Sequence, residues 1–246
     1  MTKIIAISNH KGGVGKTTST VNIGAGVALK GKKVLLIDLD PQANLTQCLG
    51  LIEPEKTIYG ALRGEYDLPV IEVNNNLFLT PSTLDLASIE IELSTKIARE
   101  VILKKMIEKI AEGFDYIFID CPPSLGLITV NAFAAANEIF IPLQAQFLAL
   151  HGLDKLTDVI ALVRENLNTN LKVGGVFITQ YDSRKILNRD IAESVSNYFD
   201  GNIFKTVIRD NVALAEAPIH GQDIFRYDPK SNGAKDYESL INEFIN

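Results

Sequence analysis

The sequence contains no tryptophan, two cysteines and three histidines among its 246 residues. Cys48 and Cys121 lie far apart and follow no metal-ligand spacing, so we expect buried reduced thiols rather than a disulfide or a zinc site. The same two residues do not supply the paired ligands of an iron–sulfur cluster. His10, His151 and His220 form no ligand constellation, which argues against hydrolysis by a histidine-bound metal.

Long apolar runs are also missing. The apolar stretch at residues 4–7 is far too short for the core of a signal peptide. The longest uncharged stretch, residues 121–137, contains two prolines, a serine and two asparagines, so it is not a membrane span. We therefore expect a soluble protein of the cytoplasm.

Positive charge is in the minority, with 24 Lys and Arg against 30 Asp and Glu, a net charge of −6. This balance argues mildly against nucleic acid as the main partner but leaves room for a local basic patch. A hydrophobic fraction of 46% with modest net charge excludes extensive disorder. A chain of this length can bury roughly three-quarters of its unfolded surface, and we expect one domain over residues 1–246.

Short apolar runs alternate with helical patterns from end to end, without a flexible linker, a low-complexity tract or an internal repeat. Near-continuous apolar strands that alternate with helices predict a parallel sheet covered on both faces. The fold class is therefore α/β, a single doubly wound domain with a mostly parallel sheet. The expected strands are residues 3–8, 33–38, 77–80, 116–120, 138–142 and 173–179, and the expected helices are residues 17–29, 97–111, 125–136, 150–167 and 188–199.

A glycine-rich turn lies between the first strand and the first helix. It reads Lys11, Gly12, Gly13, Val14, Gly15, Lys16, Thr17 and Thr18. Backbone N–H groups of such a turn, with the following helix N-terminus, bind phosphate oxygens. Lys16 adds a point charge for the β- and γ-phosphates, and the Thr17 hydroxyl can hold Mg²⁺. The pattern predicts a phosphate-binding P-loop for ATP, although His10 stands where the strict motif has glycine.

His10 and Lys11 in front of this turn resemble the deviant Walker A motif of the ParA/MinD ATPases. Further motifs of that family follow in order along the chain, so the resemblance covers nearly its whole length and is nearest to the small ParA/Soj-type partition ATPases. These motifs are residues 38–44 (DLDPQAN), 118–123 (FIDCPP), 211–218 (NVALAEAP) and 227–234 (YDPKSNGA).

The resemblance gives Lys11 a role that its spacing alone does not. In the family, the extra lysine reaches across an ATP-bound dimer to the partner's phosphates, like an arginine finger. It therefore implies a homodimer in the ATP state, with Lys11 acting in trans. Without the resemblance, a solvated lysine in a loop is the simpler interpretation.

Three carboxylates follow strands. Asp120 ends the apolar run 116–120, the setting of a Walker B acid that holds Mg²⁺ opposite Thr17; an ordinary capping aspartate is the alternative. Asp38 and Asp40 follow the second strand, at the end of the sheet where ligands bind. By resemblance, Asp40 positions the attacking water and Asp38 lies near the metal as an outer ligand. Both could instead serve turn formation, since Asp before Pro starts turns.

Arg209 and Asn211 match family positions that flank the nucleotide base. Relatives usually have proline in place of Arg209, so only its backbone could keep that contact. Asn211 keeps the family identity. We expect both in the nucleotide site.

Relatives of the partition type bind DNA without sequence preference through a basic face of the dimer, and such binding depends on phosphate neutralisation. Residues 181–235 hold eight Lys or Arg and eight Asp or Glu, so they are basic relative to the whole chain. Arg184 and Lys185 fit a DNA-contacting region of the family, whereas Ala213 stands where relatives often carry a DNA-contacting arginine. A mixed, solvated surface is the alternative.

The last eleven residues have an apolar stripe, three acids and no basic residue. Anionic lipid would repel such a segment, so we expect a docked core helix and not the membrane anchor of MinD-type relatives. The first strand opens the sequence, so we also expect no N-terminal DNA-reading extension of the kind found in larger plasmid relatives.

Two functions fit these features. The first is a Mg²⁺-ATP-dependent, dimerising ATPase switch of plasmid or chromosome partitioning, nucleoid-associated, which binds DNA nonspecifically and is stimulated by a ParB-like partner. The second is an ATP-dependent positioning or scaffold ATPase that moves a protein cargo and does not bind DNA. Ala213 and the acidic charge favour the second.

Overall fold

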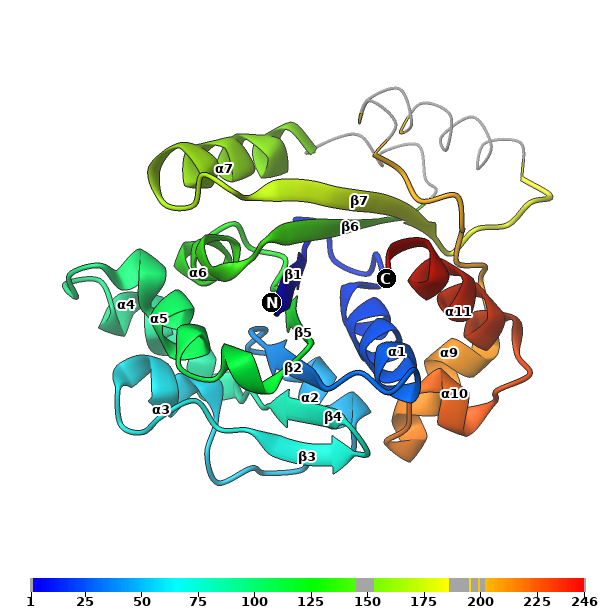
Figure 1. The fold of residues 1–246 in the computed structure, drawn as a ribbon, viewed down its shortest axis with the longest axis horizontal. Coiled ribbons are helices and arrows are strands. Elements are labelled where there is room, and N and C mark those ends of the chain that lie inside the picture. Colours follow the sequence, from blue (N-terminus) through cyan, green and yellow to red (C-terminus); the bar gives the residue numbers. More distant parts are fainter. Residues whose placement is uncertain (1, 145–152, 186–194, 196–198, 200–201, 246) are drawn as a thin grey trace.

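The computed structural model describes residues 2–144, 153–185, 195, 199 and 202–245 (Figure 1). These residues form one seven-stranded sheet, parallel except for one edge strand, with helices on both faces. The strand order is β3 (Ile71–Asn74), β4 (Leu77–Thr80), β2 (Val34–Asp38), β5 (Tyr116–Asp120), β1 (Lys3–Ile7), β6 (Glu138–Gln144) and β7 (Lys172–Thr179). The predicted doubly wound α/β fold is confirmed.

Helices cover the two faces of the sheet in separate groups (Figure 1). The first group comprises α3 (Ile58–Arg63), α4 (Ile89–Glu92), α5 (Ile102–Glu108), α6 (Leu127–Ala135) and α7 (Leu153–Asn166). The second group comprises α1 (Lys16–Leu29), α2 (Asn44–Cys48), α9 (Val212–Glu216), α10 (Ile224–Tyr227) and α11 (Asn232–Phe244). Short 3₁₀ turns lie at Leu84–Ser88, Arg99–Val101, Ala111–Gly113 and Ala217–His220.

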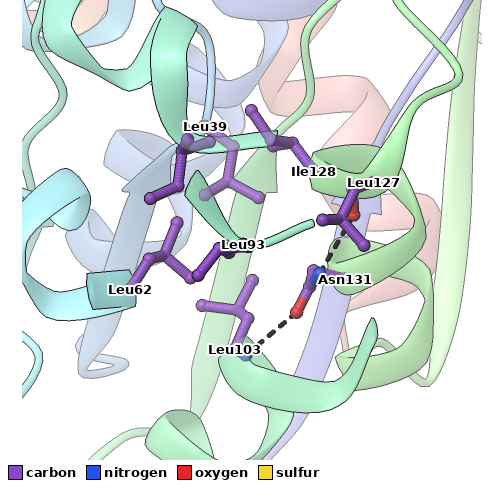
Figure 2. Close-up of a pocket in the computed structure, with 8 residues that line it drawn as sticks. Leu39, Leu62, Leu93, Leu103, Leu127, Ile128 and Asn131 are labelled. Carbon is purple, nitrogen blue, oxygen red and sulfur yellow. Dashed lines mark hydrogen bonds between the residues drawn. The ribbon is translucent and has the colours of Figure 1, made fainter. Parts of the chain in front are cut away.

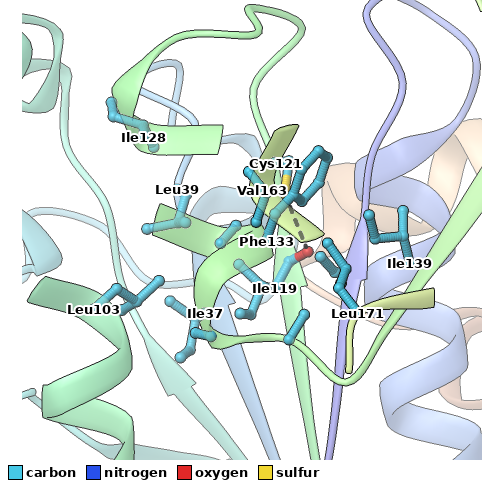
Figure 3. Close-up of a cluster of buried hydrophobic side chains, with 14 of the residues drawn as sticks. Ile37, Leu39, Leu103, Ile119, Cys121, Ile128, Phe133, Ile139, Val163 and Leu171 are labelled. Carbon is cyan, nitrogen blue, oxygen red and sulfur yellow. Dashed lines mark hydrogen bonds between the residues drawn. The ribbon is translucent and has the colours of Figure 1, made fainter. Parts of the chain in front are cut away.

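Side chains that alternate along each strand contribute to two hydrophobic cores, one on each face of the sheet. Leu35 and Ile37 of β2 pack on the first helix group, whereas Leu36 packs on the second. Successive side chains of a strand point to opposite faces, so a strand that is apolar throughout must be buried on both. Figure 3 shows the first core, where side chains from several strands meet Phe133 of α6 and Val163 of α7.

The C-terminal helix α11 belongs to the second core. Its apolar stripe packs toward α1 and the sheet, and Tyr237, Leu240 and Ile241 are fully buried. The prediction of a docked terminal helix is confirmed. No helix among the described residues is both long and apolar enough to cross a membrane.

Several predicted boundaries differ from the structure. The helix expected over 97–111 is broken, because Ala98 has a left-handed φ of 56° and only Ile102–Glu108 forms an α-helix. The helix expected over 150–167 is α7, Leu153–Asn166, with residues 150–152 outside the described part. The helix expected over 188–199 lies outside the described residues except for 195 and 199. Strand β3, which pairs antiparallel with β4, was not predicted.

Candidate nucleotide-binding site

Polar residues gather where the central parallel strands end. Asp38 ends β2 and Asp120 ends β5, and the two are register partners across neighbouring strands. Ile7 of β1 is also the partner of Asp120, so the glycine-rich loop that follows β1 begins beside both carboxylates. Ligands of open α/β sheets bind at this edge.

The loop after β1 adopts the conformation that a phosphate cradle requires. Gly13 and Gly15 have φ of 74° and 84°, a region that residues with a side chain rarely adopt. A Cβ atom added to Gly12 or Gly13 would meet nothing within 4 Å, so the space in front of the loop is open. Gly15 is the N-cap of α1, which aims the N-terminus of that helix at this space.

Lys16 lies inside the loop. Its Nζ donates a hydrogen bond of 3.1 Å to the Lys11 carbonyl, and the side chain is buried. Burial lowers the pKa of Lys16, and the nearby Asp120 carboxylate opposes that shift. An ammonium held in this position can neutralise phosphate charge, as the sequence predicts.

Asp120 accepts hydrogen bonds on both oxygens. Thr17 Oγ1 donates at 2.7 Å to one, and Thr20 Oγ1 donates at 3.2 Å to the other. Burial, with Asp38 nearby, raises the pKa of Asp120 to about 8, against the opposing effect of Thr17 and Lys16. A buried carboxylate beside a threonine hydroxyl is an oxygen donor set that suits Mg²⁺, so these residues fit the metal expected with ATP. The described residues contain no cluster of three His, Cys, Asp or Glu that could hold a metal alone.

Asp38 anchors the loop that carries Asp40. Its carboxylate accepts from the Asp40 N–H at 3.1 Å, from the Thr46 N–H at 2.9 Å and from Thr46 Oγ1 at 2.7 Å. Thr46 Oγ1 in turn accepts from the Ser82 N–H at 2.9 Å. Burial raises the pKa of Asp38 to about 6, although the Thr46 bonds lower it. The structure thus engages Asp38 with protein groups of this loop.

Asp40 is buried and lies in a tight turn before α2. One carboxylate oxygen accepts from the Gln42 N–H at 2.9 Å, and its carbonyl accepts from the Ala43 N–H. The predicted turn chemistry of Asp before Pro is therefore present. It leaves the second carboxylate oxygen without a hydrogen bond among those found in the described residues.

Residues from other strand ends hold the loop in place. The Asn9 side chain accepts from the Lys11 N–H and donates to the Pro142 carbonyl. At the end of β7, Thr179 donates to the Val14 carbonyl and Gln180 donates to the Gly13 carbonyl, both at 2.8 Å. The loop is thereby tied to β6 and β7.

A cavity of about 170 Å³ adjoins the loop. Thr18, Arg209 and Asn211 all line it, so the structure brings these predicted residues together. Asn211 caps α9 by accepting from the Ala213 N–H. The Arg209 guanidinium forms a two-pronged ion pair with Asp236 of α11, so its charge is already engaged.

The two residues predicted for DNA do not line the cavity beside the loop. Arg184 is 88% exposed and pairs through two nitrogens with Asp182. Lys185 is also exposed, and its N–H donates to the Asp182 carbonyl. Of the two predicted thiols, Cys121 is buried and Cys48 half-buried, and neither is in a disulfide.

A second, enclosed void is too small to hold a nucleotide. Figure 2 shows the void among leucine and isoleucine side chains, which include Leu39, Leu62 and two residues of α6, Leu127 and Ile128. Asn131 of α6 also lines it. Its volume is about 10 Å³, and Asn131 already donates to the Leu127 carbonyl and accepts from the Leu103 N–H. The void is a packing defect of the first core.

The site combines a glycine-rich loop, the buried Lys16, the Thr17 hydroxyl and Asp120 at the end of a strand. Together these features define a P-loop ATPase. An AAA domain model matches residues 2–173. The chain is 47% identical to the sporulation initiation inhibitor protein Soj of Bacillus subtilis, over 99% of this chain and 98% of that protein. It is 45% identical to the chromosome-partitioning ATPase Soj of Treponema pallidum, over 100% and 98%. The chain belongs to the ParA/Soj family of partition ATPases.

A solved structure supports the ligands. Cobyrinic acid a,c-diamide synthase of Mycobacterium smegmatis, with a bound ATP analogue and magnesium, superposes with a TM-score of 0.86 at 33% identity, over 98% of this chain and 93% of that one. The protein described here is accordingly an ATPase that uses ATP and Mg²⁺.

Sequence reasoning missed five residues that hold the predicted ones: Asn9, Thr20, Thr46, Thr179 and Gln180. Thr20 lies three residues after Thr17 on one helix, so the spacing alone could have indicated a second hydroxyl for Asp120. Asn9 and Thr179 are polar residues at strand ends, which is also a readable signal. Thr46 has no such signal in the sequence, because its partner Ser82 is distant along the chain.

Proposed function

We propose that this protein is a Mg²⁺-ATP-dependent molecular switch of plasmid or chromosome partitioning. The curated Soj relatives, matched over their whole length, support that role. In this proposal the protein works in the cytoplasm and associates with the nucleoid while ATP is bound. It dimerises on ATP, binds DNA without sequence preference, and returns to the free state when a ParB-like partner stimulates hydrolysis.

The site residues divide the work of phosphoryl transfer. The loop N–H groups of residues 12–18 and the Lys16 ammonium would hold the phosphates. Thr17 and Asp120 would hold Mg²⁺, which neutralises charge on the β- and γ-phosphates. Asp40 would orient the attacking water with its second carboxylate oxygen. Asp38 would hold the Asp40 loop in place, and lie near the metal only as an outer ligand.

Arg209 and Asn211 would lie beside the base, and the Arg209 side chain would not bind it. They line the cavity beside Gly15, where a base attached to loop-bound phosphates could lie. Because the Arg209 guanidinium pairs with Asp236 and the Arg209 N–H donates to the same carboxylate at 3.0 Å, only the backbone carbonyl of Arg209 would be available to a base.

The observation that carries the proposal is the place of Lys11. Its carbonyl accepts a hydrogen bond from Lys16 Nζ, and its N–H donates to the Asn9 side chain. These two bonds hold the backbone of Lys11 at the open side of the loop. Its side chain is half-buried at the same mouth. In this proposal Lys11 would reach the phosphates bound by a facing subunit, where charge develops during transfer.

Titration with a nonspecific DNA duplex, with and without ATP, tests the partition role. We expect binding that needs ATP and falls steeply with salt, because it depends on counterion release. The hydrolysis-deficient Asp40→Ala variant should hold the bound state longer. If neither wild type nor Asp40→Ala binds duplex at low salt, the partition proposal is wrong.

A protein-cargo positioning ATPase that does not bind DNA is the second candidate. The Arg184 charge is paired with Asp182, Ala213 supplies no charge, and the net charge is −6. The same titration separates the candidates, since a cargo ATPase would dimerise on ATP and leave the duplex free.

A further inference from the structure

A groove lies between α3 and α5, on the first helix group and apart from the residues of the nucleotide site. Its volume is about 550 Å³, within the range of cavities that bind ligands. We call it the α3–α5 groove, and its lining is formed by Ala61, Leu62, Gly64, Tyr66, Asp67, Lys96, Ile97, Ala98, Ile102, Lys105, Met106 and Lys109.

One wall is a stripe of α5 and the residue that follows it. Ile102, Lys105, Met106 and Lys109 are spaced i, i+3, i+4 and i+7, which places them on one side of the helix. The opposite side of α5 carries Leu103, which is fully buried in the first core. Ile102 and Met106 also pack partly against the first core, so the side of α5 that borders the groove is half-buried and carries Lys105 and Lys109 beside them.

The floor of the groove is apolar and adaptable. Ile97 is 94% exposed, and Ile102 and Met106 are half-buried beside it. The exposed Ile97 and the partly exposed Ile102 and Met106 together give the groove an apolar surface that a partner could cover. Methionine also adapts its shape to a partner, and it is enriched in protein interfaces.

The rim of the groove is basic. Three lysines line it against the single acid Asp67, which leaves two positive charges in a chain of net charge −6. Lys109 pairs with Asp67 at 2.9 Å, but both side chains are exposed, so the pair is weak. Among the described residues Lys105 has neither a hydrogen-bond nor an ion-pair partner.

We propose that the α3–α5 groove binds an acidic amphipathic helix of a partner protein. Apolar side chains of that helix would contact Ile97 and Met106, and its carboxylates would face Lys105, since Lys96 already donates to the Leu62 and Arg63 carbonyls. A groove between two helices that takes an apolar helix face is a recurring mode of peptide recognition. This site is independent of ATP binding and of the partition proposal.

Other occupants fit less well. Nucleic acid binds through its phosphates and gains little from an apolar floor that includes Ile97 and Met106. A second copy of the chain placed groove to groove would oppose lysines with lysines, because a two-fold contact brings the same patch together.

Fluorescence anisotropy with two labelled peptides tests the proposal. Both are about 20 residues long, roughly 30 Å of helix, and rich in glutamate. In the first, leucines form one helical stripe; in the second, the same leucines are scattered around the helix. We expect the striped peptide to bind and the scattered one to bind at least about tenfold more weakly, which is about 1.4 kcal/mol.

Three variants locate the binding. Lys105→Glu and Ile97→Asp should each weaken the striped peptide about tenfold, one through charge and one through apolar contact. Lys104→Glu is the matched control, because Lys104 is the neighbouring residue of α5 but lines a different depression with Glu108. It should change the affinity less than about twofold. Thermal melting and the ATPase rate should stay at wild-type values for all three.

Several outcomes would overturn the assignment. Equal binding of both peptides, or an equal loss with Lys104→Glu, would reduce it to general charge attraction. Duplex DNA that is released by Lys105→Glu but not by Ile97→Asp would assign the surface to nucleic acid. Self-association that Ile97→Asp abolishes would assign it to a second copy, and no binding at about 1 mM peptide, the weak end of measurable affinity, would refute the site.

Discussion

At the scale of single residues, burial disfavours the charged forms of two carboxyl groups in the site. Burial raises the pKa of Asp120 to about 8 and that of Asp38 to about 6, far above the usual value for aspartate. Their charged forms are costly in the protein alone, and a bound cation would relieve that cost. Without ligand, the protein is more stable when Asp120 is protonated, whereas Mg²⁺ binding needs the charged carboxylate. Stability and function therefore favour opposite protonation states of Asp120.

These pKa values predict a pH dependence of stability. An acid with a raised pKa binds its proton more tightly when folded, so the free energy of unfolding falls as pH rises from about 4 to about 8. The slope reaches about 1.4 kcal/mol per pH unit for each titrating group. Urea unfolding without nucleotide should show this fall, and Asp120→Asn should flatten it above pH 6 and stabilise the protein at pH 8. An unchanged slope in Asp120→Asn would show that Asp120 does not titrate there.

Thr46 links three parts of the site through one hydroxyl. Thr46→Val keeps the shape but leaves the Ser82 N–H without its acceptor and removes one donor from Asp38. We expect a loss of about 1–3 kcal/mol in unfolding free energy. We also expect a lower kcat with little change in KM, because the Asp40 loop loses part of its anchor.

Thr46→Ser is the control for that prediction, since it restores the hydroxyl. Recovery of kcat in Thr46→Ser would separate the hydrogen bonds from the lost methyl group. If Thr46→Val turns over ATP at the wild-type rate, the anchoring role of Asp38 and Thr46 is wrong.

At the scale of elements, the buried strands were predictable, whereas the edge strand β3 and the short helices were not. Strands such as β2 and β5 are apolar throughout because both faces are buried, and that run is visible in the sequence. The break before α5 depends on the left-handed backbone of Ala98. Alanine does not favour that conformation, so the sequence does not indicate the break. Strand β3 is short and half-exposed, so its pattern is too weak to recognise.

The site shows the same division. The loop, Thr17 and Asp120 were readable because a local motif and a strand end place them. Their supports were not, because Thr46 meets Ser82, and Gln180 meets Gly13, only after distant segments fold together. Arg209 pairs with Asp236, a partner 27 residues away that no local pattern indicates.

The docking of α11 gives a prediction at this scale. Phe244 packs edge-on against Phe118, Phe140 and Phe204, which ties the end of α11 to the sheet. Phe244→Ala should lower the free energy of unfolding by about 3–5 kcal/mol, measured by urea denaturation. Glu238→Ala, on the exposed side of the same helix, should change it by less than about 0.5 kcal/mol. Equal effects of both changes would contradict the docking.

At the scale of the whole molecule, the proposed function makes this chain one half of a two-subunit catalytic unit. In that proposal the phosphate-binding loop, the residues that would hold Mg²⁺ and Asp40, which would orient the water, all come from this chain, and Lys11 lies at the start of the loop. A lysine that acts in trans needs a facing subunit, so ATP binding and dimerisation are one event in this account. Nothing in that account depends on whether the cargo is DNA or protein.

The most direct test is the solution mass by light scattering with and without Mg²⁺-ATP. Asp40→Ala, which retains ATP, should change from 27.0 kDa to twice that mass when ATP is added. Lys11→Ala added to that variant should still bind ATP but stay at the mass of one chain, whereas Lys16→Ala should lose ATP binding itself. A Lys11→Ala variant that dimerises on ATP as fully as its parent would contradict the account.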